Sequence, residues 1–399
     1  MANNLGTYSL RSILCSFLTL LVIQQDAKAL FPLIGGRVNL VANNKIQYDS
    51  NISSSSTDPS SDLIYKLAPG FQFTLDQGLV GIELDSNIEL GRFVDNEVLN
   101  YENLILSALI KYPLVRESPL DIIVEASFNE NSRPNPIVSE RVETQTLRLN
   151  TGLRYKFLPI FGAGIDYSFS QTNSLIPNSG VSLSDIDQHS IRTSINYEYS
   201  ELLGFDITYR FRQNQISANQ RDAQSILDSE RMTGVDHAII VGARGSLTSL
   251  LDGNVDLGVF RRDLNDGMGA KYGFLSSTNL VWHAIPELTD ISLSLIADTT
   301  PTPVNDSIIS KNLRVAVTQT FNPFLSAEIM ARWGITDYTN IMAGDSPRKD
   351  YTYGLGLSFF VTFNEYMTLS TMLNHIWMDT NSGGGFQRTI FDLSLDTRY

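Results

Sequence analysis

The chain has 399 residues, and its 43 acidic and 29 basic side chains give it a formal charge of −14. Hydrophobic residues make up 42% of the chain and charged residues only 18%, which excludes a chain that is disordered throughout. The acidic balance disfavours a nucleic-acid partner, because it repels phosphate. The single cysteine, Cys15, excludes a disulfide framework and a multi-cysteine metal site.

Residues 1–29 are expected to form a secretory signal peptide that is cleaved from the mature protein. A positively charged start precedes an apolar run at residues 12–23, and residues 27–29 (Ala-Lys-Ala) provide the small-x-small pattern of a cleavage site. The apolar run is too short to span a bilayer as a helix. Cys15 lies in the middle of this run, whereas a lipoprotein would need it at the end. We therefore expect one mature domain, residues 30–399, without cysteine.

Apolar and polar residues alternate in many stretches of the mature chain. Between Val80 and Leu90, every second side chain is apolar apart from Ser86, and the others are acidic, amide or glycine residues. This period of two is typical of a strand with one apolar and one polar face. Runs of about ten residues exceed the usual strand of a soluble sandwich and suit a tilted strand that crosses a bilayer. The same pattern recurs at residues 120–128, 161–169, 191–199, 205–211, 325–333 and 351–359.

The connections between these runs alternate between short and long. The long ones are rich in Asn, Asp, Ser, Gly and Pro, which favour loops, and the two lengths are typical of the periplasmic turns and extracellular loops of an outer-membrane barrel. Short connections are expected at residues 75–79, 157–161, 200–203, 321–324 and 362–366. Long connections are expected at residues 49–62, 129–140, 172–188, 213–234, 299–307, 336–348 and 379–386.

Together these patterns predict an all-β fold, a closed antiparallel transmembrane β-barrel of about 18 strands. Sixteen strands are the alternative if the weak runs at residues 98–112 and 366–377 are not strands. Only outward side chains meet lipid, so about half of each strand is free to be polar. Aromatic and proline residues at the short connections (residues 112–113, 158–159 and 321–324) are expected to join a periplasmic aromatic girdle.

The chain ends on alternating apolar positions closed by an aromatic residue: Phe391, Leu393, Leu395 and Tyr399. This ending resembles the C-terminal signal by which the barrel assembly machinery recognises bacterial outer-membrane proteins. An ordinary edge strand that ends in tyrosine is the alternative. With the export signal and the unequal connections, the ending predicts a location in the bacterial outer membrane, with membrane lipid and the assembly machinery as partners.

Short motifs also mark the N-terminal part of the mature chain. Asp-Ser-Asn-Ile at residues 49–52 precedes a polar loop, and Ile-Tyr at 64–65 leads to Ala-Pro-Gly-Phe at 68–71. The stretch from 49 to 94 resembles the opening of a β-barrel porin family of Gram-negative bacteria whose members are associated with exopolysaccharide production. The resemblance implies an outer-membrane barrel that forms a pore for sugars or polymer, and it implies no catalytic residues.

Charged residues of opposite sign are expected on the inner face. If the apolar positions of each strand face lipid, their neighbours face the lumen. An acidic wall is then formed by Glu83, Asp85, Glu89, Asp121 and Glu125. A basic arc is formed by Arg148, Arg154, Arg192, Arg210, Arg212, Arg244 and Arg262. Opposed charges across a water-filled channel would orient polar or ionic solutes, whereas the alternative is that these residues neutralise each other in a packed interior.

Candidate catalytic and metal-binding residues are few. No Gly-x-Ser-x-Gly nucleophile elbow is present, and no two histidines have metal-ligand spacing. Residues 263–267 resemble part of a calcium loop but lack its distal glutamate, and the glycines at 383–385 follow no strand that opens into a helix. We therefore expect no enzyme, no metal and no cofactor. The four histidines are His189, His237, His283 and His375.

The sequence thus favours a porin-like outer-membrane channel for the passage or export of hydrophilic solutes, with saccharides or exopolysaccharide as the first candidates. The alternative is a non-conducting barrel that serves as a structural or surface-binding part of a polysaccharide export system. A lumen filled by an inward loop or by bulky side chains would favour the alternative.

Overall fold

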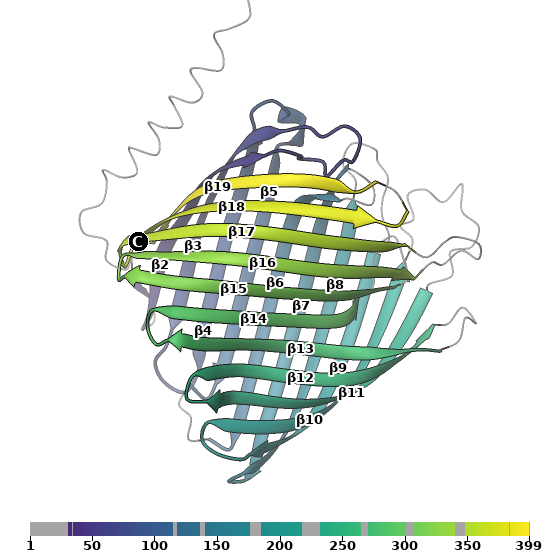
Figure 1. The fold of residues 1–399 in the computed structure, drawn as a ribbon. Helices are drawn as coiled ribbons and strands as arrows, with labels where there is room; N and C mark the ends of the chain where they lie inside the picture. The colour runs from purple at the N-terminus through teal and green to yellow at the C-terminus, as the bar shows by residue number, and fades with distance from the viewer. Residues whose placement is uncertain are drawn as a thin grey trace, which may run out of the picture.

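The computed structural model describes residues 31–33, 35–114, 118–135, 140–175, 185–217, 232–264, 270–300, 307–339, 348–382 and 384–398. The expected signal peptide, residues 1–29, and Tyr399 lie outside this set. The described chain consists almost entirely of long antiparallel strands that run side by side around one barrel (Figure 1).

The barrel wall contains 18 strands, β2 to β19. A short strand β1 (Phe31–Leu33) pairs with the start of β2, and a 3-10 helix η1 (Glu97–Leu99) lies between β4 and β5. The wall strands are β2 (Gly36–Asp49), β3 (Asp62–Leu75), β4 (Gly81–Phe93), β5 (Tyr101–Tyr112), β6 (Leu120–Asn135), β7 (Glu140–Leu158), β8 (Phe161–Leu175), β9 (Asp185–Glu198), β10 (Leu203–Ser217), β11 (Met232–Thr248), β12 (Leu251–Leu264), β13 (Ala270–Ile285), β14 (Thr289–Thr300), β15 (Ser307–Asn322), β16 (Leu325–Thr339), β17 (Lys349–Asn364), β18 (Met367–Thr380) and β19 (Phe386–Arg398).

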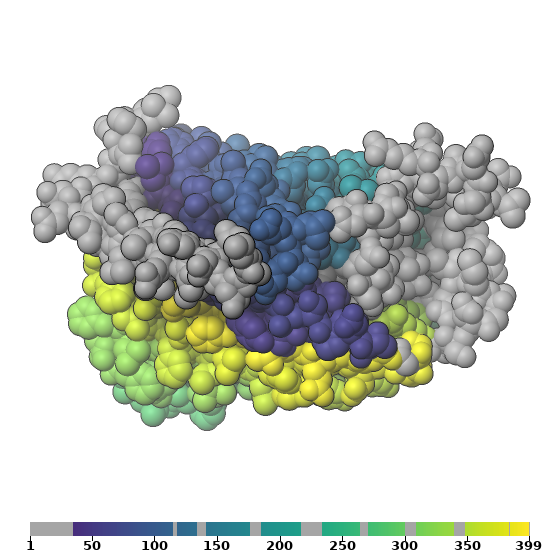
Figure 2. All heavy atoms as spheres, turned by 90° about the horizontal axis from the view of Figure 1, so that it is seen from above, coloured from purple at the N-terminus to yellow at the C-terminus, as the bar shows by residue number. Residues whose placement is uncertain are grey.

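The sheet closes because its last strand pairs with the first strand of the wall. β19 lies antiparallel to β2, with partners from Ile390 and Asp49 to Arg398 and Val41. Figure 2 shows these N-terminal and C-terminal segments, purple and yellow, side by side on one flank of the molecule. Closure lets the strands satisfy their backbone hydrogen bonds within lipid. The prediction of an 18-stranded closed barrel is confirmed, and both weak runs are strands, β5 and β18.

The outer face is apolar, as the alternation predicts. Ile195, Ile207, Val241 and Leu257 are successive cross-strand partners on β9 to β12, and each exposes 55–62% of its surface. Thr208, the next residue after Ile207, lines a cavity inside the barrel. Neighbouring residues therefore point to lipid and to the lumen in turn, and the chain needs apolar side chains at only half of its strand positions.

Short turns join the strands at the periplasmic end. The side-chain oxygens of Asn322 and Asn364 each accept a hydrogen bond, 2.9 Å long, from the backbone N–H two residues ahead, which is how asparagine stabilises a tight turn. Phe321, Phe324 and Phe363 flank these turns and are exposed on the outside. Such aromatic residues suit the boundary between lipid and water.

At the opposite end the strands extend further than the alternation indicates. β6 continues to Asn135, β8 to Leu175 and β16 to Thr339, into residues that we expected to be loops. The expected loop boundaries are wrong here, because a strand that projects beyond the bilayer keeps its ladder of backbone hydrogen bonds but no longer needs apolar residues on one face. Polar composition therefore marks the edge of the membrane rather than the end of the strand.

Candidate functional site in the lumen

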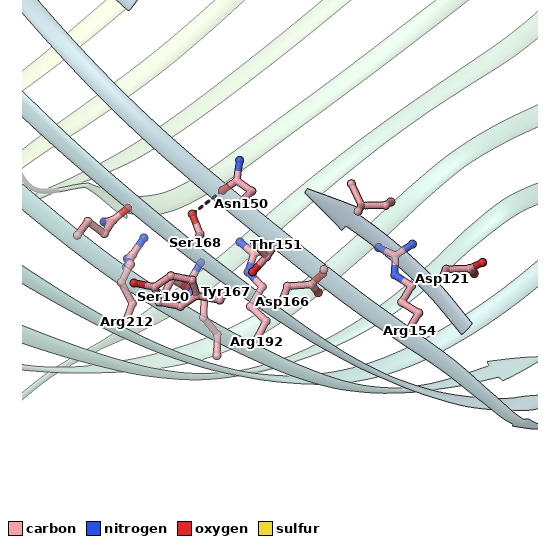
Figure 3. A pocket seen from close by; sticks show the side chains of 14 residues that line it. Asp121, Asn150, Thr151, Arg154, Asp166, Tyr167, Ser168, Ser190, Arg192 and Arg212 are labelled. Carbon is pink, nitrogen blue, oxygen red and sulfur yellow. Dashed lines mark hydrogen bonds between the residues drawn. The ribbon is translucent and has the colours of Figure 1, made fainter. Parts of the chain in front are cut away.

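A polar cavity of about 380 Å³ lies against the inner wall formed by β6 to β10. Figure 3 shows side chains from successive strands that project into the same space, with Ser168 donating a 2.7 Å hydrogen bond to Asn150. The volume is within the range of small-molecule sites. The charged residues that line the cavity are Asp121, Arg154, Asp166, Arg192, Arg210 and Arg212.

A second cavity of about 380 Å³ continues along the inner wall towards β14. It shares Arg154, Asp166, Arg192 and Arg210 with the first cavity, so the two form adjacent parts of one polar surface. Arg244 lines its far part and donates hydrogen bonds to Asp206, at 2.8 Å, and to Asn196, at 2.9 Å.

The strand register determines how these charges meet. Asp121 is the direct cross-strand partner of Arg154, and Asp166 is that of Arg192. Arg192 is in turn the direct partner of Arg210. Two like charges in this position repel each other, so the Arg192–Arg210 pair requires nearby carboxylates. The charges on the inner wall therefore alternate in sign from strand to strand, but arginine outnumbers aspartate where the two cavities meet.

The expected acidic wall lies on the inner faces of β4 and β6, and most of it is hydrogen-bonded. Glu83 pairs with Lys111 at 3.0 Å, and Glu89 accepts a 2.9 Å hydrogen bond from the Tyr101 hydroxyl. Asp85 accepts a hydrogen bond from a serine and Glu125 accepts one from an asparagine. Asp121 differs from these four because it lines the first cavity.

The expected basic arc divides into an exposed part and a buried part. Its exposed members lie on β7, β9 and β11 and are Arg148, Arg154, Arg192 and Arg244. Its buried members lie on β10 and β12 and are Arg210, Arg212 and Arg262, each at most 6% exposed. Burial of three guanidinium groups requires acidic partners, and these are not among the residues of the expected acidic wall.

The acidic partners are Asp236, which is buried, and Asp298, which is partly exposed. Asp236 on β11 is completely buried and lies at the centre of the cluster. Its carboxylate accepts hydrogen bonds from Arg212, at 2.5 and 2.9 Å, and from Arg262, at 2.5 and 2.9 Å. Asp298 on β14 accepts a forked pair of hydrogen bonds from Arg210, at 2.9 and 3.0 Å. This fork is the favoured geometry of an arginine–carboxylate pair.

Arg210 reaches Asp298 because the outer end of β14 bends into the barrel. The ladder between β13 and β14 ends at the pair of Ser276 and Ala297, whereas β14 continues to pair with β15 as far as Thr300. Thr299, which by strand parity would face lipid, is 2% exposed and hydrogen-bonds to Arg212 and Asp236. Because Thr299 lies on the inner side of the wall instead, β14 must turn inward beyond Ala297.

The neighbouring strand β15 follows the same course. Ile309, the cross-strand partner of Thr299, packs against a buried cluster of Ala238, Phe260 and Leu275 on the inner wall of β11 to β13. The outer end of the β14–β15 hairpin, here residues 297–300 and 307–309, is therefore held against the inner wall of β10 to β13 by ion pairs and by apolar contact.

A second inward element is the connection between β2 and β3. Ile52, in this loop, is 3% exposed and packs against Ile64, Phe93 and Tyr101, whose side chains lie on the inner wall. Asn51 stabilises the loop, because its side-chain amide bonds to backbone atoms of Ser55 and of β19. The expectation of a connection at 49–62 is met, but the loop folds inward because its isoleucine gains apolar contacts there.

The four histidines lie on four different strands, β9, β11, β13 and β18. His189 and His237 lie on the outer face, where they hydrogen-bond to the hydroxyls of Tyr167 and Tyr209. The fourth histidine, His375, bonds to a threonine hydroxyl on β19. Both ring nitrogens of His283 contact carboxylates, at 2.7 and 3.1 Å.

No group of three His, Cys, Asp or Glu residues with metal-binding geometry occurs among the described positions. In the stretch that resembles a calcium loop, Asp263 pairs with Arg261 at 2.8 Å, and residues 265–269 lie outside the described set, as does Gly383. Across the same described ranges, no helix is long and apolar enough to cross a membrane.

A closed antiparallel barrel with an apolar exterior, a polar interior and turns of unequal length is an outer-membrane protein of bacteria. The chain belongs to the family described as "Putative beta-barrel porin 2", whose model matches residues 41–399. This match confirms the resemblance to a porin family noted in residues 49–94. No curated protein matches the sequence.

Solved structures of proteins from one bacterium are similar to this chain at low sequence identity. OpdO of Pseudomonas aeruginosa is 13% identical, with a TM-score of 0.50, over 91% of this chain and 97% of that one. OccK9 (OpdG) of the same organism is 11% identical, with a TM-score of 0.47, over 91% and 98%. The outer-membrane protein OpdK, also from P. aeruginosa, is 14% identical, with a TM-score of 0.42, over 91% and 99%.

Proposed function

We infer that this protein is a porin-like channel that lets small hydrophilic solutes cross the outer membrane by diffusion. The observation that carries this proposal is the pair of adjoining polar cavities on the inner wall, lined by exposed Arg154 and Arg192. A barrel of this size encloses space that side chains alone do not fill. No step of catalysis is proposed for it.

Saccharides are the first candidate solutes. The cavities offer amide, hydroxyl and guanidinium groups, among them Asn150, Ser168 and Ser194, and these donate and accept hydrogen bonds as sugar hydroxyls do. Export of an exopolysaccharide is the narrower form of the proposal and rests on the resemblance in residues 49–94.

Liposome swelling with sugars of graded size tests the proposal. Proteoliposomes that contain the refolded protein are expected to swell in an iso-osmotic pentose or hexose, and more slowly in a disaccharide or trisaccharide, because the hairpin and the loop narrow the lumen. Protein-free liposomes are the control. Swelling in none of the sugars would contradict the proposal and would favour the alternative, a non-conducting barrel that serves a polysaccharide system as a structural or surface-binding part.

The charges of the inner wall are expected to set ion selectivity. The double variant Arg154→Glu/Arg192→Glu should move the reversal potential in a KCl gradient towards that of potassium, because it replaces two positive charges beside the narrow region by negative ones. Arg37→Glu reverses one charge near the periplasmic end, where Arg37 pairs with Asp76, and should shift the potential by less than half as much as the double variant. Equal shifts in the two variants would show that the cavities do not lie on the ion path.

Export and assembly complete the proposal. Residues 1–29 would direct the chain to the periplasm, and the last strand would then present Phe391, Leu393 and Leu395 to the barrel assembly machinery, with Tyr399 as the closing aromatic. Phe391 supports this role because it is exposed on the outer face, whereas Leu395 is buried in the folded barrel and would be accessible only before closure.

A further inference from the structure

The ion cluster between β10 and β14 contains more positive than negative charge. Arg210, Arg212 and Arg262 face two carboxylates, those of Asp236 and Asp298, which gives the cluster a formal charge of +1. Two buried guanidinium nitrogens, Nε of Arg210 and Nη1 of Arg262, have no hydrogen-bond partner within the described chain. Burying donors in this way is costly, and the excess of positive charge favours an anionic ligand at the cluster.

The two carboxylates differ in how easily a solute could replace them. The side chain of Asp236 is fully buried, whereas that of Asp298 is 32% exposed and lines the second cavity. Asp298, together with Thr299, also holds the bent end of β14 against the side chains of β10 and β11. A group that enters the cavity therefore meets the Asp298 carboxylate first.

We propose that a carboxylate-bearing solute binds Arg210 and Arg212 in place of Asp298 and thereby releases the outer end of the β14–β15 hairpin from the inner wall. The ligand class follows from geometry. Both guanidinium groups lie on the inner face of β10 and already hold one carboxylate, Arg210 by a fork at 2.9 and 3.0 Å and Arg212 at 3.3 and 3.5 Å. A carboxylate on a solute matches this fork, whereas a neutral sugar does not.

Exchange of the Asp298 carboxylate for that of the solute couples solute binding to release of the hairpin end. The ligand has access to the two arginines only when Asp298 has left them, so it binds the released hairpin more tightly than the bent one, and that difference in affinity shifts the equilibrium. The remaining contacts, those of Thr299 with Arg212 and Asp236 and that of Ile309 with Ala238 and its neighbours, would then be lost as the hairpin moves. The inference rests on the proposed function, because the solute must reach the cluster through the lumen.

Cysteine labelling measures the release without any need for conduction. Ala238 is 2% exposed beneath Ile309, and Cys15 lies in the expected signal peptide, so refolded residues 30–399 with Ala238→Cys carry one thiol. A small maleimide is expected to label this thiol about tenfold or more faster in sodium glucuronate than in glucose at matched ionic strength, the change expected when a charge-assisted hydrogen bond is lost. Ala316→Cys, buried on β15 away from this cluster, is the matched control and should show no such difference.

The variant Asp298→Asn separates the two parts of the inference. In this background the thiol of Ala238→Cys is expected to react fast without ligand, because the ion pair between residue 298 and Arg210 is already lost, and glucuronate should add little. Equal labelling rates of Ala238→Cys in glucuronate and glucose would overturn the binding site, and a slow rate in the Asp298→Asn background would overturn the role of Asp298 in holding the hairpin end. Failure of liposome swelling would instead contradict the channel, so the two failures are distinguishable.

Discussion

The variant Asp236→Asn is expected to lose about 3–5 kcal/mol of its free energy of unfolding, the usual effect of removing one partner from a buried ion pair. Asp236 is fully buried and accepts hydrogen bonds from Arg212 and Arg262, which are themselves buried. The neutral amide would leave two buried guanidinium charges without their main counter-charge.

Urea unfolding of the protein refolded in detergent micelles measures this loss. Asp263→Asn is the matched control on the adjacent strand, because Asp263 pairs with Arg261 while both side chains are exposed, and such a pair contributes about 0–1 kcal/mol. Equal unfolding free energies for the two variants would mean that the Asp236 cluster is hydrated and open rather than buried.

The second large effect is expected on the outer face of the barrel. Ile207→Arg should destabilise the folded protein by about 2–4 kcal/mol, the cost of an arginine on the lipid face near the bilayer midplane. Ile207 is 61% exposed and lies in a row of exposed apolar residues with Ile195 and Val241. The charge would have to leave water for hydrocarbon.

Thr208→Arg is the control for this change, because the two residues are adjacent in sequence and lie on opposite faces of β10. Thr208 lines a polar cavity, so an arginine there keeps its hydration and should cost less than the Ile207 variant. Unfolding in phospholipid vesicles measures both variants. A larger loss for Thr208→Arg would show that the assignment of the two faces is reversed.

The sequence was sufficient to predict the barrel because its signal is local. Alternation between neighbouring residues reports which face of a strand meets lipid, and Glu83 or Arg192 could be assigned to the inner face from its neighbours alone. The number of strands followed from counting such runs. Neither inference requires knowledge of which residues meet across the lumen.

The partners of the buried arginines could not be predicted in this way. Arg210 and Asp298 are 88 residues apart, on strands separated by three others, and they meet only because β14 leaves β13 beyond Ala297. The alternation of outward and inward side chains would place Thr299 on the lipid face, because it assumes a strand that follows a regular barrel wall. The alternation along β11 places Asp236 on the inner face, and this pattern alone was sufficient to predict it as a lumen residue.

The inward loop was missed for a similar reason. Residues 49–62 have the composition of a solvent-exposed loop, and Ile52 is a single apolar residue within it. Only the three-dimensional position of Ile64, Phe93 and Tyr101 shows that this isoleucine has apolar neighbours inside the barrel. These three residues lie on β3, β4 and β5, and the alternation within each strand does not show that the loop folds over them.

Single-channel recording in planar lipid bilayers tests most directly whether the lumen is a continuous aqueous path. Refolded protein, verified as folded by its heat-modifiable mobility on a gel, is expected to insert and to give discrete steps of current in KCl. Folded protein that inserts into the bilayer and carries no current at any voltage would contradict the channel.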